Sequence, residues 1–213
     1  GTEYEYLMRK ADKALYLAKE KGKNRHIIYE ERLHGKLETD DMQNMAMAYA
    51  VSKEKKREAI TEMITELCVS GVNAIVKSEE RLQQIRSLFD LDGITVFSDR
   101  GNRLVCRNGN YMAEAPDGRL GFEDEGYLSL FGDDDIFVES NMIKLRSQNP
   151  AAYAVTQEQE VGAALQCLSR KEGIPYTMVN FEVFNRNRKW SDEDITLLTL
   201  LGHCIGDLLN YSE

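Results

Sequence analysis

The chain has 213 residues, and 42% of them are hydrophobic, so it can bury a substantial core. Its net charge of −9, from 27 Lys and Arg against 36 Asp and Glu, argues against a nucleic-acid partner, because such binding depends on cations that contact phosphates. No apolar stretch is long enough to span a bilayer and the N-terminal segment is charged, so we expect no membrane contact and a cytoplasmic location.

The N-terminal segment is predicted to be an amphipathic helix that ends near Gly22. Its apolar residues recur at steps of three and four and form one narrow face: Leu7, Ala11, Ala14, Leu15 and Ala18. Lysines gather at its end, where the helix dipole is negative. Residues 26–29, with the sequence HIIY, are predicted to form a short strand.

The run from Arg9 to Arg25 resembles the closing helix of the GGDEF domain, the diguanylate cyclase module, which typically reads R-A-D-x-A-L-Y-x-A-K-x-x-G-R-N-R. The resemblance implies that residues 1–29 are the C-terminal tail of such a domain and that the parent is a longer signalling protein. It also implies that Lys19 and Lys23 match positions that hold the triphosphate of GTP. Lys23 departs from the family arginine and loses the bidentate fork. The alternative is that both lysines are solvated cations, and we expect no catalysis by this chain.

Residues 30–52 are predicted to be a helical linker that continues into a long helix. A second amphipathic segment then ends before Asp90, and the apolar period changes to two, which indicates strands. The predicted strands are residues 94–98, 103–107 (prolonged by 111–113), 136–138, 162–168 and 177–184, with a short helix within 150–161.

The C-terminal helix is the clearest element. Ser191 is its predicted N-cap, three acidic residues follow in the first turn, and residues 195–209 are apolar on more than one face. Such width suggests a second packing partner, so we predict a homodimer. The expected interface residues are Ile60, Met63, Ile64, Leu67, Leu197 and Leu200.

The segment from Asn185 to Asp194, with the sequence NRNRKWSDED, is similar to the closing motif of many GAF domains, R-x-W-[ST]-x-E-[ED]. Together with the order of elements, this resemblance covers about residues 53–211 and defines a predicted GAF-like sensor domain at 53–213. It implies an α+β, profilin-like fold: about six antiparallel strands, with the N- and C-terminal helices on one face. It also implies a ligand pocket on the other face, under residues 133–161.

We expect this pocket to bind a small molecule, whose identity the sequence does not indicate. Alternation in the strand 177–184 leaves Asn180 off the apolar face, and aromatic residues lie in the crossing. The expected lining residues are Phe97, Cys106, Phe137, Tyr153 and Asn180. The cyclic-nucleotide pattern of the family is absent, and the histidines and acidic runs lack metal-site spacing, so no cofactor or metal is expected.

Three functions remain open. The favoured one is a small-molecule-sensing or dimerisation module of a bacterial cyclic-di-GMP signalling protein, in contact with adjacent signalling domains of its chain. The second is a ligand-free structural module that only dimerises. The third is a GAF-fold free methionine sulfoxide reductase, which needs an exposed thiolate and a resolving cysteine. Against the third, the four cysteines lack C-x-x-C spacing and are predicted to be buried thiols.

Overall fold

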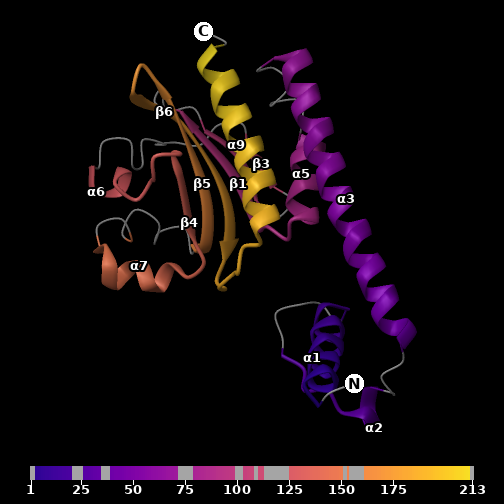
Figure 1. The fold of residues 1–213 in the computed structure, drawn as a ribbon. Helices are drawn as coiled ribbons and strands as arrows, with labels where there is room; N and C mark the ends of the chain where they lie inside the picture. Colours follow the sequence, from indigo (N-terminus) through magenta and orange to yellow (C-terminus); the bar gives the residue numbers. More distant parts are fainter. Residues whose placement is uncertain are drawn as a thin grey trace. The chain divides into compact units, whose positions relative to one another are not determined.

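The computed structural model describes residues 3–20, 26–34, 39–71, 79–98, 103–107, 110–112, 125–150, 153 and 161–211 (Figure 1). The chain divides into two compact units, residues 1–54 and residues 55–213.

The regular elements described in the first unit are helices. It contains α1 (Glu3–Glu20), α2 (Glu31–His34) and the beginning of α3 (Thr39–Ser70). The predicted N-terminal helix is therefore present, but the predicted strand at 26–29 is wrong, since residues 26–30 adopt no regular structure. A strand needs a neighbouring strand for its backbone hydrogen bonds, and the described residues of this unit contain none. Lys23 and the side chain of Lys19 lie outside the described residues.

The second unit is built on one antiparallel sheet. Its described strands are β1 (Gly93–Ser98), β2 (Arg103–Arg107), β3 (Asn110–Met112), β4 (Ile136–Glu139), β5 (Val161–Lys171) and β6 (Ile174–Phe184), in the order β3-β2-β1-β6-β5-β4. The central hairpin of β5 and β6 turns at Glu172 and Gly173, which both have positive φ, as hairpin turns that match the strand twist require.

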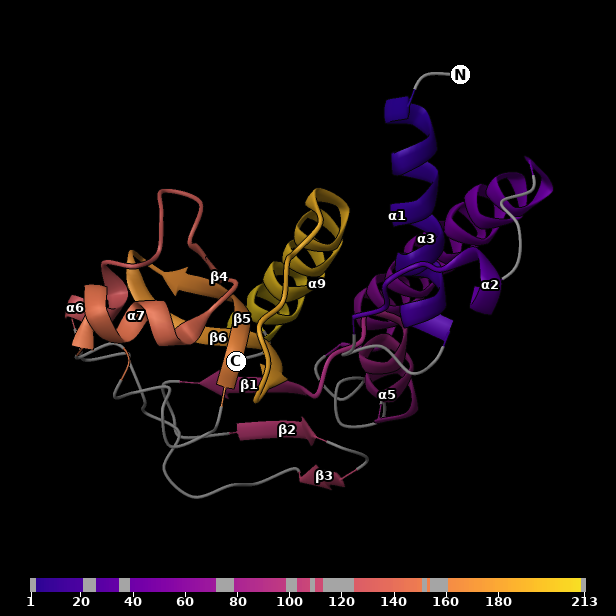
Figure 2. The same ribbon diagram turned by 90° about the horizontal axis from the view of Figure 1, so that it is seen from below.

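Helices cover both faces of this sheet. The later part of α3, α5 (Glu79–Leu88) and α9 (Asp192–Tyr211) pack on one face, and α6 (Glu125–Leu128) and α7 (Met142–Gln148) lie on the other. Figure 2 shows α7 and α9 on opposite sides of the central strands. The predicted α+β architecture, with the flanking helices on one face, agrees with this arrangement.

The α3/α5/α9 face holds the larger core. Inward residues of the three central strands contact the helices there, including Ile94 on β1, Cys167 on β5 and Phe181 on β6. Helix α9 comes close to β5 at Gly202, where an added Cβ would lie 2.6 Å from the Cys167 Sγ. The close approach leaves no room for a side chain, so the sequence of α9 is adapted to this sheet.

The predicted dimer residues have different positions. Ile60, Met63 and Leu67 are at most 1% exposed in the core of the single chain, so the argument from uncovered apolar area does not apply to them. Ile64 and Leu197 are partly buried against the same core, whereas Leu200 is 55% exposed. The sequence pattern could not distinguish burial by α9 and α5 from burial by a second chain.

Candidate functional site

A row of buried polar side chains crosses the α6/α7 face of the sheet. Thr95 on β1 is opposite Asn180 on β6, and Asn180 is opposite Gln166 on β5. Glu182 lies one pleat further along β6. None of the four side chains is more than 5% exposed. Each alternates along its strand with apolar neighbours that point to the opposite face of the sheet. Buried polar groups in the middle of a sheet are costly unless they are hydrogen-bonded, so their concentration marks this face as a candidate site.

Two hydrogen bonds organise the row. The Thr95 hydroxyl donates to Glu182 Oε2 at 3.1 Å, and the Tyr127 hydroxyl of α6 donates to Gln166 Oε1 at 2.6 Å. Burial raises the pKa of Tyr127 above its ordinary value, so its phenol stays protonated and remains a donor. This hydrogen bond connects helix α6 to strand β5 at the candidate site.

Asn180 differs from its neighbours because its side-chain oxygen Oδ1 is buried and has no hydrogen-bond partner among the described residues. Leaving such an acceptor unsatisfied costs about 1–3 kcal/mol. The site thus contains an unused acceptor at the centre of the sheet.

The structure brings most of the predicted ligand-binding residues to this face. Phe97 and Phe137 are buried in its apolar cluster, Tyr153 packs against that cluster, and Asn180 is part of the polar row. Cys106 is placed differently. Its backbone pairs with Ile94, a residue of the core on the α3/α5/α9 face, and its side chain lies outside the described residues.

Sequence reasoning missed Thr95, Gln166 and Tyr127 as site residues. A signal was present for the first two, since each is a single polar residue inside an apolar strand. Tyr127 carried no such signal, because it reaches Gln166 from a short helix 39 positions away in the chain.

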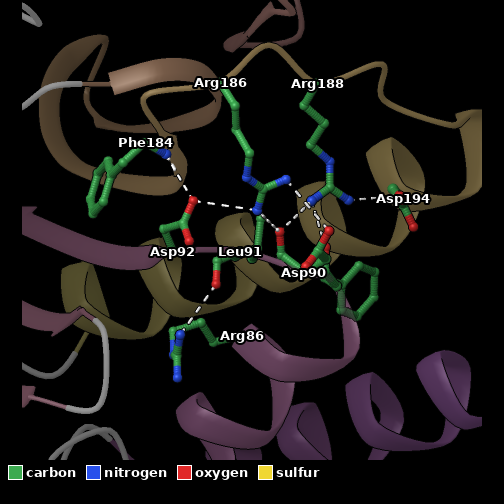
Figure 3. Close-up of polar contacts among 9 residues, drawn as sticks. Arg86, Asp90, Leu91, Asp92, Phe184, Arg186, Arg188 and Asp194 are labelled. Atoms are coloured by element: carbon green, nitrogen blue, oxygen red, sulfur yellow. Dashed lines mark hydrogen bonds and ion pairs between the residues drawn. The ribbon is translucent and has the colours of Figure 1, made fainter. Parts of the chain in front are cut away.

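A second polar network lies where β6 leads into α9 (Figure 3). The guanidinium of Arg188 donates to the carbonyl oxygens of Phe89 at 2.5 Å and Asp90 at 3.0 Å, and to Asp194 Oδ2 at 2.9 Å. Asp194 also accepts a hydrogen bond from Lys56 Nζ at 2.6 Å. Burial lowers the pKa of Arg188, and the neighbouring Asp194 carboxylate opposes that shift. The network, which we call the Arg188 junction, ties α3, the end of α5 and the start of α9 together.

Arg186 extends the junction to the start of β1. Its guanidinium lies 3.4 Å from Asp92 Oδ2 and 3.1 Å from the Asp90 carbonyl oxygen. Asp92 Oδ2 also accepts a hydrogen bond from the Phe184 amide at 2.9 Å, as Figure 3 shows. The strands that carry Thr95 and Glu182 are therefore held together at this end.

The loop that carries the junction also reaches the α7 side of the sheet. The Arg188 amide donates to the Ser140 carbonyl at 3.0 Å, and Trp190 Nε1 donates to the Glu139 carbonyl at 3.2 Å. The Glu139 side chain in turn accepts from the amide of Asn141, the N-cap of α7. Polar and ring contacts thus run without a break from the cap of α7 to α3.

Two other classes of site receive no support from the described residues. They contain no group of three or more His, Cys, Asp or Glu side chains placed to hold a metal ion. Within the same ranges, no helix is both long and apolar enough to cross a bilayer.

No family model and no curated protein sequence matches this chain. Similar solved structures include the Stigmatella aurantiaca phytochrome photosensory core module, with 16% identity, a TM-score of 0.51, and coverage of 73% of this chain and 36% of that one. The chromophore-binding domain of a bacteriophytochrome from R. palustris has 13% identity, a TM-score of 0.50, and coverage of 75% and 62%. The GAF domain of the Acinetobacter phosphoenolpyruvate-protein phosphotransferase has 12% identity, a TM-score of 0.49, and coverage of 73% and 92%.

These similarities concern the fold alone. The chain spans less than two thirds of the length of the two phytochrome structures. The two phytochrome structures, with TM-scores of 0.51 and 0.50, have a similar fold to this chain. The resemblance of residues 1–29 to a GGDEF tail stays a prediction.

Proposed function

We propose that residues 53–213 form a regulatory sensor module that binds a small molecule on the α6/α7 face of the sheet. The observation that supports this most strongly is the buried, unpartnered oxygen of Asn180. An N–H group of a ligand at this oxygen recovers the hydrogen bond that the protein leaves unmade.

The neighbouring groups define the chemical class of that ligand. Asn180 and Glu182 lie two residues apart on β6 and carry acceptor oxygens on this face, while Phe97 and Phe137 belong to the apolar cluster on the same face. A small molecule with N–H donors on a flat or apolar body, such as a nucleobase or an aromatic amide, fits these groups.

The signal is proposed to leave the module through the Arg188 junction. Ligand binding changes an output only if two arrangements of the protein have different ligand affinities. The chain of contacts from the α7 cap through Trp190 and Arg188 to Lys56 supplies a physical connection between the ligand face and α3.

Thermal shift measurements test the proposal. Nucleobases, nucleosides and aromatic amides are screened against the unmodified chain and against Asn180→Leu. A bound compound is expected to raise the melting temperature of the unmodified chain, because it stabilises only the folded state, and to lose this effect in the variant. If no compound shifts the melting temperature and Asn180→Leu is simply more stable, the sensing function is rejected.

If the sensing function is rejected, the second candidate function is that of a ligand-free module that serves dimerisation. The exposure of Leu200 on α9 favours it, since a large apolar side chain is uncovered there. Sedimentation velocity at tens of micromolar protein tests this candidate, because a constitutive dimer is expected without any added compound.

The parent protein is proposed to act in cyclic-di-GMP signalling, with a diguanylate cyclase domain upstream. The support is the motif from Arg9 to Arg25 alone. This chain is then expected to make no cyclic-di-GMP from GTP and magnesium, because it lacks the family's metal-binding carboxylates. Product above a blank would contradict the assignment of residues 1–29 as a mere tail.

A further inference from the structure

Two cysteines from distant parts of the sequence lie on helices of the α3/α5/α9 face of the sheet. Cys68 is in the last turn of α3 and is exposed, contrary to the prediction of a buried thiol, and Cys204 in α9 is partly exposed. Lys56 and Arg57 on α3 form ion pairs with Asp194 and Glu193 at the start of α9. Further along the two helices, the chain neighbours of the cysteines, Leu67 and Ile205, are both buried in the same core cluster. Desolvation by burial is the main cause that raises the pKa of Cys204, and the nearby Cys68 thiol, through its charge and a side-chain hydrogen bond, raises it further, as expected for thiols that lie close together.

We propose that Cys68 and Cys204 form a reversible intramolecular disulfide when the protein meets a peroxide. The bond would join the end of α3 to α9, the two helices that the Arg188 junction already connects at the other end. This modification site is independent of the ligand face, because both thiols lie on the opposite side of the sheet.

The reaction has two steps. The Cys68 thiolate attacks the peroxide oxygen, the O–O bond breaks, and an alcohol or water leaves while Cys68 becomes a sulfenic acid. The sulfur of Cys204 then attacks the sulfenic sulfur and releases water. In total, two thiols are oxidised by two electrons, and one peroxide is reduced.

Exposure assigns the roles within the pair. Cys68 is the thiol that a dissolved oxidant can reach, and Cys204 is the resolving thiol. Burial and the nearby Cys68 raise the pKa of Cys204 to about 11, so Cys204 is protonated at neutral pH and is a poor first target. Cys167 is 1% exposed and its pKa is raised to about 12, so it provides an internal control that should not react.

Peptide mapping tests the site in the full chain. Protein is treated with hydrogen peroxide, unreacted thiols are alkylated, and the digest is analysed without reduction. The expected product is a peptide pair that joins Cys68 to Cys204, is lost on treatment with dithiothreitol, and is accompanied by an intact Cys167 thiol. A Cys68–Cys68 link between two chains, or a disulfide to Cys106, would overturn the proposal.

Two variants separate the roles of the thiols. Cys204→Ser should leave a sulfenic acid on Cys68 that dimedone traps, whereas Cys68→Ser should leave Cys204 unmodified under the same conditions. Both serines are close in size to cysteine, and circular dichroism confirms that each variant is folded. If Cys204 is still oxidised in Cys68→Ser, the assignment of Cys68 as the entry point is wrong.

Discussion

At the scale of single residues, the unusual group is Arg188. Only 11% of its side chain is exposed, yet its guanidinium is supplied with two carbonyl oxygens, the Asp194 carboxylate and the face of Trp190 at 4.3 Å. A buried charge is tolerated when it is paired and hydrogen-bonded in this way. The pair is also sensitive to substitution, because the loss of either partner leaves the other charge buried without compensation.

We expect Arg188→Ala to lower the free energy of unfolding by about 3–5 kcal/mol, the typical effect of removing one member of a buried ion pair. Arg81→Ala is the matched control, since Arg81 forms more exposed ion pairs with Glu62 and Glu66 on the same face. Its expected cost is at most about 1 kcal/mol. Urea denaturation followed by circular dichroism measures both values, and equal costs would contradict the special role of Arg188.

Cys167 is expected to make stability depend on pH in the alkaline range. Burial raises the pKa of its thiol from 9.0 to about 12, so the folded chain keeps this proton after the unfolded chain has lost it. The stabilisation is therefore complete below pH 9 and is lost as the pH rises toward the folded value. The slope is about 1.4 kcal/mol per pH unit for one proton.

Urea denaturation at pH 8, 9 and 10 of the unmodified chain and of Cys167→Ala tests this expectation. Tyrosines and lysines titrate in both proteins, so the difference between the two slopes isolates the thiol. Identical slopes would show that the Cys167 thiol ionises equally easily in both states.

At the scale of secondary-structure elements, α9 connects the local pattern with the tertiary packing. Ser191 caps it as predicted, with its Oγ accepting from the Asp194 amide at 3.1 Å. Its apolar width is used mostly within the chain, since Leu198, Leu201 and Ile205 are fully buried against the sheet and its neighbouring helices. The wide apolar surface of α9 is therefore covered mostly by the sheet and the neighbouring helices of the same chain, and little of it is exposed.

We expect Gly202→Ala to be destabilising by about 1–3 kcal/mol, the usual cost of overpacking. Helix propensity alone predicts a gain of about 1 kcal/mol from the same change. Overpacking prevails because the new Cβ would lie 2.6 Å from the Sγ and 2.8 Å from the Cβ of Cys167, which is fixed in a central strand. Thr196→Ala, on the exposed side of α9, is the control.

Thermal unfolding of Gly202→Ala, Cys167→Ala and the double variant measures the coupling between the two positions. Removal of the sulfur opens space for the new methyl group, so the double variant should lose less stability than the sum of the single changes. Simple additivity would contradict the packing explanation.

At the scale of the whole molecule, both hydrophobic cores belong to residues 55–213. Their most N-terminal member is Ala59, and α9 supplies the last. The second unit therefore has its own source of stability. Its described surface retains one large exposed apolar side chain on α9, that of Leu200.

Leu200→Glu is expected to weaken the proposed homodimer without loss of stability of the sheet, because Leu200 lies outside the core. Sedimentation velocity at a series of protein concentrations measures the effect, with at least a tenfold weaker association expected from about 1.5–3 kcal/mol of lost burial. Ile60→Glu is the contrasting variant, and it should unfold the unit. An unmodified chain that is monomeric at tens of micromolar would rule out the dimer.

The sequence by itself determined the features that depend on neighbours along the chain. The cap at Ser191, the alternation that set Asn180 apart in its strand, and the amphipathic helix at the N-terminus each follow from residues within a few positions. Local backbone geometry fixes such patterns, so they can be read without knowledge of the fold.

Only the tertiary structure decided which groups meet. It placed Ile60 inside the core of the single chain, set Cys106 opposite Ile94, and brought Tyr127 to Gln166. It also left residues 26–30 without a strand, because strand formation needs a partner. Sheet register and helix docking are settled by contacts between distant segments and by competition for burial, and a periodic pattern states only that a residue is buried, not what covers it.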